Sequence, residues 1–434
     1  MNRLAVLLLL AASSSTASAF MASPPTSTRA MMVGRTNTLS SSTSKTAESV
    51  EVTNDNNDDD ATAGMLPEYA AAYKKAIQVV EGVVGDSDPM MKAGLHHFCM
   101  EYVSATQKSF EKTKSETATP EMALQRIMEG LQYGFKFGMG PDKYTFGVTH
   151  EALRGDPETE DGNTMDFYGW GCDFFRDFID LDDSLVAGEE NLQKALEQAK
   201  AGENVVFLAN HQSEADPQVV SLLLEKAGYG EAGADVVYVA GHKVTTDALA
   251  IPFSMGRNLI CIHSKKHINA DPDTKPIKSR QNLAAMSGML DKLKKGGTIL
   301  WVAPSGGRDR RDVEKGVTPI APFDSKTLDM FRLMGNKSKK PTHFYSMAMV
   351  SYELCPPPDS IEAGTGEQRN FRFTPVAIKV GPELVSEGGL EQRQAWNKHA
   401  MDQTLEDYIE IRSKLFPGTE PEMEKGTAEG DDEE

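Results

Sequence analysis

His211 and Asp216 lie five residues apart, directly after an apolar run that ends at Ala209. A turn between them can bring the carboxylate back against the imidazole, which fixes the tautomer of the ring and favours its protonated form. A histidine held in this way can act as a general base on a hydroxyl group. Asp216-Pro217 also has the form of a helix N-cap followed by proline at the first helical position. Capping is therefore the competing interpretation of Asp216.

Two further segments that follow apolar runs are rich in basic side chains. HSKKH (263–267) follows Ile262, and APSGGRDRR (303–311) follows Val302. Consecutive glycines let backbone N–H groups approach a ligand, and arginine offers planar, bidentate donors for a phosphate. A solvated basic loop and a basic turn beside a sheet are the competing interpretations. The second segment is not a Walker loop, since the sequence contains no GxxxxGK[ST].

These segments follow short apolar runs that alternate with helical patterns. Strands are expected at 205–209, 236–240, 259–262, 298–302, 344–350 and 374–380, with helices at 217–227 and 282–295. Such alternation predicts an α/β fold with a mixed, largely parallel central sheet. In parallel sheets, sites gather where loops leave the carboxyl ends of the strands. We therefore expect the three segments to meet at one edge of the sheet.

The region before this alternation has the periodicity of helices. Apolar residues recur at helical spacing in its first part, at Tyr73, Ile77, Val80 and Val84. Thr119-Pro120 has the form of a helix start. We expect a small N-terminal helical domain at 63–150, followed by a larger α/β domain at 151–416.

The N-terminus has the composition of a targeting sequence. Residues 1–19 contain a short apolar run and the small-residue site Ala17-Ser18-Ala19, as in a signal peptide. Residues 20–62 begin with a stretch rich in Ser and Thr and free of acidic residues, typical of a transit peptide, and end in an acidic linker. A signal peptide joined to a transit peptide resembles the bipartite pre-sequence of algae with complex plastids. This resemblance implies the plastid stroma.

The charge is unevenly distributed along the chain. The whole chain of 434 residues carries a net charge of −19, which argues against a nucleic-acid partner. Residues 417–434 are expected to form a disordered acidic tail. Residues 242–315, in contrast, hold 14 Lys and Arg against 7 acidic residues, which indicates an anionic substrate. The four cysteines form no disulfide pattern, and no other stretch approaches 18 apolar residues, so we expect a soluble mature protein.

Longer blocks around these residues resemble one known family. NHQSEADP (210–217), FSMGRNLICIHSKKH (253–267), WVAPSGGRDR (301–310) and the proline run at 356–358 closely resemble the soluble plastid glycerol-3-phosphate acyltransferases. The blocks occur in the order and spacing of that family. The likeness covers about 66–416, and the blocks are more specific than HxxxxD alone, which glycerolipid acyltransferases share.

The resemblance implies an activity and roles for particular residues. His211 would be the base, Asp216 its partner, and Lys266, His267, Arg308 and Arg310 would surround the substrate phosphate. The reaction would move a fatty acyl group from acyl-acyl carrier protein, or less favourably acyl-CoA, to the sn-1 hydroxyl of glycerol 3-phosphate. This gives 1-acyl-glycerol 3-phosphate in the first step of plastid glycerolipid synthesis. No metal or cofactor is expected, since His and Asp form no convincing ligand set.

Two alternatives stay open from the residues alone. The nearer one is another HxxxxD acyltransferase, acting on lysophosphatidate or dihydroxyacetone phosphate. Acylation of a membrane lipid favours an anchor, and the sequence after the pre-sequence has no obvious one. The other alternative is a non-catalytic phosphate-binding α/β protein. No GxSxG nucleophile elbow supports a serine hydrolase.

Overall fold

The computed structural model of the chain describes residues 62–84, 88–155, 165–264, 268–269, 271–357, 368–385 and 390–418. Its first part consists of the helices α3 (Pro67–Val84), α4 (Pro89–Thr113) and α5 (Pro120–Tyr133) and the π-helix η1 (Gly134–Met139). The predicted helix start at Thr119 is confirmed, because its hydroxyl accepts a 3.3 Å hydrogen bond from the Met122 N–H. The residues Tyr73, Ile77, Val80 and Val84 are all buried, as the apolar periodicity indicates.

A single sheet follows, with strand order β1-β5-β4-β6-β3-β7-β8-β2. Its strands are β1 (Thr149–His150), β2 (Leu185–Ala187), β3 (Asn204–Ala209), β4 (Val237–Gly241), β5 (Asn258–Ile262), β6 (Ile299–Val302), β7 (Thr342–Val350) and β8 (Ala377–Glu383). The neighbouring pairs from β5 to β7 are parallel, whereas β1 and β8 are antiparallel to β5 and β7. The prediction of a mixed, largely parallel sheet in an α/β fold is therefore confirmed.

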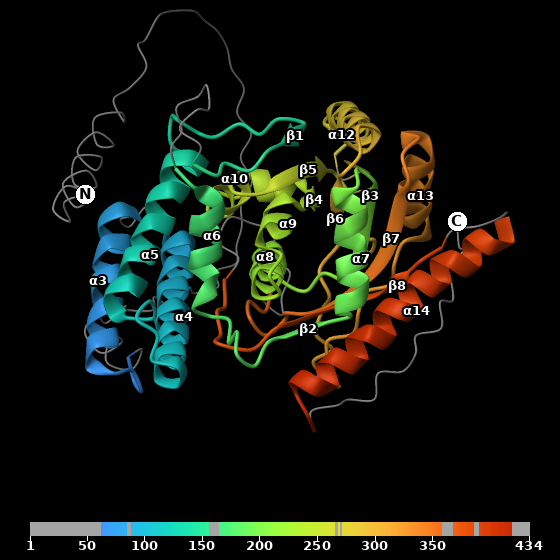
Figure 1. Cartoon of the computed structure of the whole chain (residues 1–434). Helices are drawn as coiled ribbons and strands as arrows, with labels where there is room; N and C mark the ends of the chain where they lie inside the picture. Colours follow the sequence, from blue (N-terminus) through green and yellow to red (C-terminus); the bar gives the residue numbers. More distant parts are fainter. Residues whose placement is uncertain are drawn as a thin grey trace, which may run out of the picture.

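Helices cover both faces of this sheet (Figure 1). They are α6 (Phe167–Arg176), α7 (Glu189–Lys200), α8 (Asp216–Lys226), α9 (Gly230–Asp235), η2 (His242–Thr245), α10 (Ile251–Met255), α12 (Lys275–Lys295), α13 (Ser325–Ser338) and α14 (Leu390–Leu415). Strand β3 shows the two layers, because Val205 and Phe207 pack with α7 and α8, whereas Val206 and Leu208 pack with α12 and α13. A strand buried on both faces has to be apolar throughout, which explains the unbroken apolar run before the His211 segment.

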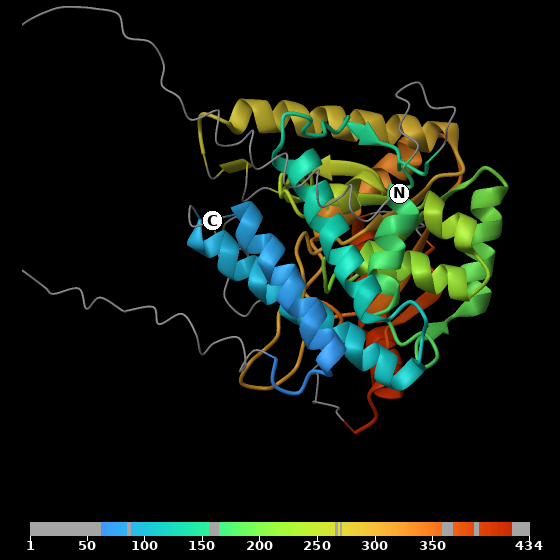
Figure 2. The same cartoon turned by 90° about the vertical axis from the view of Figure 1, so that its left-hand side faces the viewer.

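The N-terminal helices gather at one side of the molecule (Figures 1 and 2). An aromatic cluster joins them to the sheet region. Tyr102 of α4 lies 4.7 Å from Phe174, 4.5 Å from Phe178 and 5.8 Å from Phe371 between ring centroids. These helices and the sheet thus share one continuous hydrophobic core, and their division into separate domains stays a prediction.

The predicted targeting segments at 1–19 and 20–62 and the acidic tail lie outside the described residues, except for Thr62 and the two tail residues 417–418. Within the part of the chain that is described, no helix has the length and apolar character needed to cross a membrane.

Candidate active site

Five strands carry polar residues at one edge of the sheet. Because β5, β4, β6, β3 and β7 run in parallel, their carboxyl ends meet at the same edge. In that order, they lead into His263, His242, the segment 303–311, His211 and Ser351. The sequence predicted three of these segments, and the strand order places the His211 segment between the 303–311 segment and Ser351.

The structure brings His211 and Asp216 together. The His211 Nδ1 atom lies 2.7 Å from the Asp216 Oδ2 atom. Since the carboxylate accepts, Nδ1 carries the donated proton and Nε2 is the nitrogen with a lone pair. Asp216 is fully buried, whereas the His211 side chain is 27% exposed. The ring of Trp301 packs edge to face against the imidazole, with 5.7 Å between centroids. The Asp216 carboxylate therefore orients an imidazole that is partly exposed to solvent.

Capping is the wrong interpretation of Asp216. Asp216 is the first residue of α8 rather than its N-cap, and no side chain caps that helix end. Its carboxylate turns back to the preceding loop, where the Gln212 N–H donates to Oδ2 over 2.8 Å. The Ser213 N–H and hydroxyl donate to Oδ1 over 3.2 and 3.0 Å. A third residue, Ser351 after β7, donates its hydroxyl to Oδ1 over 2.6 Å. These donors stabilise a buried carboxylate and fix its position against His211.

A buried hydrogen-bond network lies behind the His211 loop. The Asp309 N–H donates to the His211 carbonyl over 2.6 Å, and Asn210 Nδ2 donates to the Asp309 carboxylate over 3.1 Å. Gln212 Nε2 donates to the Tyr408 hydroxyl of α14 over 3.1 Å. Burial raises the pKa of the Asp309 carboxyl to about 6, although hydrogen bonds oppose this shift. The network fixes the His211 loop to the 303–311 segment and to α14.

Arg308 and Arg310 flank the buried Asp309 in the loop after β6. Arg308 Nη1 lies 3.4 Å from Glu214 Oε1, so this guanidinium group reaches the loop between His211 and Asp216. Arg310 is exposed. The turn that begins this segment needs glycine, because Gly306 has a φ of +70°.

Arg369 is a further basic residue of this region, and sequence reasoning missed it. Its Nε atom lies 3.3 Å from Glu214 Oε2, and its Nη2 atom lies 2.7 Å from Asp247 Oδ2. Arg308 and Arg369 thus share the two oxygens of one carboxylate, although 61 positions separate them in the sequence. Ser351 and Tyr408 were missed as well. No local pattern marks any of the three, since each contacts the loop from a distant segment.

Lys266 and His267 lie outside the described residues, so their predicted contact with a phosphate stays a prediction. The first residue of the same segment, His263, stacks on His242 with 3.8 Å between ring centroids. Burial and the neighbouring His263 imidazole hold the pKa of His242 below its ordinary value. Among the described residues, no three His, Cys, Asp or Glu side chains are grouped as metal ligands.

The chain is similar to known acyltransferases. A family model described as Acyltransferase matches residues 184–350, which contain the His211 loop and the 303–311 segment. The chain is 35% identical to the chloroplastic glycerol-3-phosphate acyltransferase of Arabidopsis thaliana over 306 residues, covering 70% of this chain and 63% of that protein. The spinach protein (Spinacia oleracea) of the same name is 38% identical over 243 residues, covering 56% and 50%. One from Cucurbita moschata is 32% identical over 344 residues, covering 77% and 71%.

The matched segment and the Cucurbita moschata relative, of which the chain covers 71%, place the chain in the acyltransferase class. More narrowly, it belongs to the family of the chloroplastic glycerol-3-phosphate acyltransferases, which confirms the resemblance found from the sequence blocks. The chain spans 63% and 50% of the length of the Arabidopsis and spinach relatives.

Proposed function

We propose that this protein transfers a fatty acyl group from acyl-acyl carrier protein or acyl-CoA to the sn-1 hydroxyl of glycerol 3-phosphate. The observation that carries the proposal is the His211 imidazole, held at 2.7 Å by a buried carboxylate at the edge of the sheet where Arg308 also lies. A base beside cationic groups fits a substrate that carries a hydroxyl and a phosphate. The family supports this choice, because its named members act on glycerol 3-phosphate.

The phosphate would bind Lys266, His267, Arg308 and Arg310, which places the sn-1 hydroxyl against His211 Nε2. His211 removes the hydroxyl proton while the oxygen attacks the thioester carbonyl carbon of the donor. The tetrahedral intermediate collapses as the C–S bond breaks, and the imidazolium returns its proton to the departing thiolate. The products are 1-acyl-glycerol 3-phosphate and the free carrier thiol.

Asp216 acts on this reaction through His211. Its carboxylate holds the proton on Nδ1 and stabilises the positive charge that the ring gains during the attack. The three other residues that donate to Asp216, namely Gln212, Ser213 and Ser351, hold its carboxylate in place. Glu214 has a different role in the proposal. It balances the charges of Arg308 and Arg369 before the substrate phosphate binds.

The donor and the compartment are part of the proposal. Acyl-acyl carrier protein is favoured over acyl-CoA because the relatives are named chloroplastic. The composition of residues 1–62 also supports import into a plastid, with the stroma as destination. A fluorescent protein fused after residue 62 should enter the stroma, and a cytosolic signal would contradict that location.

The purified protein tests the function when it is given labelled glycerol 3-phosphate with either donor. We expect a labelled 1-acyl product, and His211→Ala should lower kcat by about 10²–10⁴-fold. His399→Ala provides the matched control, because His399 is an exposed histidine on α14. Equal rates for His211→Ala and the unchanged protein would overturn the mechanism. Failure of the unchanged protein with both donors would overturn the function.

A second variant tests the phosphate site. Arg308→Ala should raise the KM for glycerol 3-phosphate much more than the KM for the acyl donor, since only the acceptor carries the phosphate in question. Equal effects on the two KM values would contradict this role for Arg308.

A further inference from the structure

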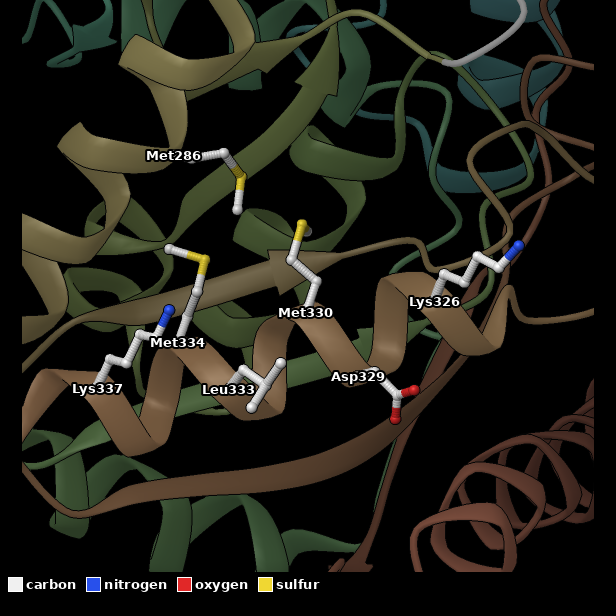
Figure 3. Close-up of a pocket in the computed structure, with 7 residues that line it drawn as sticks. All are labelled: Met286, Lys326, Asp329, Met330, Leu333, Met334 and Lys337. Atoms are coloured by element: carbon white, nitrogen blue, oxygen red, sulfur yellow. The ribbon is translucent and has the colours of Figure 1, made fainter. Parts of the chain in front are cut away.

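A groove lies between two helices on the face of the sheet opposite α7 and α8. Helices α12 and α13 pack on this face, and a pocket of about 330 Å³ separates part of their outer surfaces (Figure 3). Four apolar side chains and three charged ones line it: Met286, Met330, Leu333, Met334, Lys326, Asp329 and Lys337. Methionine side chains are flexible and adapt to the shape of a partner, so a groove rich in methionine suits the binding of another protein.

The groove begins beside the candidate active site. At the start of α13, the Asp324 N–H donates to the carbonyl of Pro304, in the loop that carries Arg308, over 3.2 Å. In α12, Asn282 accepts from the His263 N–H over 2.7 Å and donates to its carbonyl over 2.9 Å. Both helices are thereby fixed to the edge of the sheet where His211 lies. A partner in the groove would have one end next to the acyl-transfer site.

The two helices are strongly basic within an acidic chain. They contain nine basic residues, Lys275, Lys278, Arg280, Lys292, Lys294, Lys295, Lys326, Arg332 and Lys337. Their two acidic residues, Asp291 and Asp329, lie 3.2 and 3.4 Å from the basic groups of Lys294 and Arg393. The chain as a whole carries −19. The surface of α12 and α13 therefore complements an acidic partner.

Basic residues near both ends of the groove flank exposed apolar side chains. Lys326 and Lys337, both exposed, stand near its two ends, about 16 Å apart along α13 at 1.5 Å per residue. Leu333 between them is 55% exposed, and Leu283, one turn before Met286 on α12, is 73% exposed. This pattern fits an amphipathic helix of about three turns with an apolar face and acidic residues at both ends.

From these observations we propose that the groove between α12 and α13 docks the acidic carrier protein that brings the acyl group. The carrier would lay an acidic, amphipathic helix along the groove and extend its thioester arm over the sheet edge toward His211. The inference rests on the proposed function for the identity of the partner. A protein helix is favoured over a lipid bilayer because the apolar side chains line a hollow between the helices (Figure 3).

A charge reversal at both ends of the groove tests the proposal. The double variant Lys326→Glu/Lys337→Glu changes two exposed lysines that no ion pair holds within the described residues. We expect the KM for acyl-acyl carrier protein to rise by about ten-fold or more, with kinetics unchanged for acyl-CoA and glycerol 3-phosphate. Leu333→Ser, also at an exposed position, should raise the same KM without changing the charge.

The matched control is Lys75→Glu/Lys108→Glu. It makes the same charge change at exposed lysines of α3 and α4. This control should leave the KM for acyl-acyl carrier protein unchanged. Loss of donor affinity in the control and in the groove variant alike would show that only net charge matters, and would overturn the docking site. An unchanged KM in both groove variants would overturn it as well.

Binding measurements separate this inference from the proposed function. Holo-acyl carrier protein is titrated onto the full chain carrying His211→Ala, with and without the Lys326→Glu/Lys337→Glu change. Weaker binding in the groove variant supports the docking site even if acyl transfer fails with every donor. Equal binding overturns the docking site even if transfer succeeds. Loss of sedimentation with phosphatidylglycerol vesicles, together with equal carrier binding, would assign the groove to a membrane surface instead.

Discussion

Ser351 offers a sharp test of how the structure positions the base. Its hydroxyl donates to Asp216 Oδ1 over 2.6 Å, the shortest of the three hydrogen bonds to that oxygen. Both residues are buried, so water does not readily replace the hydrogen bond that the substitution removes. Ser351→Ala should therefore lower the free energy of unfolding by about 1.5–3 kcal/mol, the usual range for a hydrogen bond to a charged group. The melting temperature should fall by about 2–4 °C.

The effect on catalysis is distinct from this loss of stability. Ser351 acts through Asp216 and His211. Ser351→Ala should therefore lower kcat by about ten-fold, because the His211 imidazole is held less precisely. The KM for glycerol 3-phosphate should stay nearly constant. In the His211→Ala background, Ser351→Ala should lower the residual rate no further, since its route of action is already removed.

Ser346→Ala is the matched control for both measurements. Ser346 is a buried serine of β7 whose hydroxyl donates to the Asp407 carboxylate over 3.3 Å. Its loss should lower stability but leave kcat unchanged. An unaltered kcat in Ser351→Ala, or an equal loss of kcat in Ser346→Ala, would refute the positioning role. A further fall of the residual rate in the His211→Ala background would refute it too.

Three further predictions follow from contacts of buried or basic groups. Burial raises the pKa of Asp309 in the folded protein from 3.8 to about 6. Between these pH values the folded state therefore binds more protons than the unfolded state. The free energy of unfolding should fall by about 3 kcal/mol as the pH rises from about 4 to about 6. Asp309→Asn should remove this dependence in urea titrations, and an unchanged slope would contradict the assignment. In Arg369→Ala, Glu214 loses one of its two arginine partners and should bind Arg308 more strongly, in competition with the substrate phosphate. The KM for glycerol 3-phosphate should rise by about ten-fold with little change in kcat. A pure fall in kcat would count against it. Arg126→Ala leaves its buried ion-pair partner Asp177 uncompensated and should cost about 3–5 kcal/mol in equilibrium unfolding; a cost below about 1 kcal/mol would disagree.

Local patterns in the sequence were sufficient to predict six of the eight strands of the described sheet, but fewer of the helices. The apolar run before His211 marked β3, and Thr119-Pro120 marked the start of α5. Both signals depend on neighbouring residues only, because strand burial and helix capping act over a few positions. Strand order was a different matter. Which strands neighbour β3 depends on how the connecting helices pack, and that was visible only in the folded chain.

The interpretation of Asp216 shows where local reasoning fails. The Asp-Pro pair has the form of a cap, yet its carboxylate turns back to His211 and to Ser351, 135 positions away in the sequence. A cap and a partner for a base share the same local sequence. The choice between them depends on which donors the rest of the fold brings to the carboxylate.

The sequence by itself determined the parts of the candidate site that lie in continuous segments: His211 with Asp216, and Arg308 with Arg310. The sequence also determined which strands precede these segments along the chain. The tertiary structure alone decided what supports these parts, namely Ser351 and Tyr408 behind the His211 loop and Arg369 beside Arg308. The reason is physical. Parallel strands need long crossover connections, so residues that meet at one edge of the sheet are far apart in the chain and leave no local pattern.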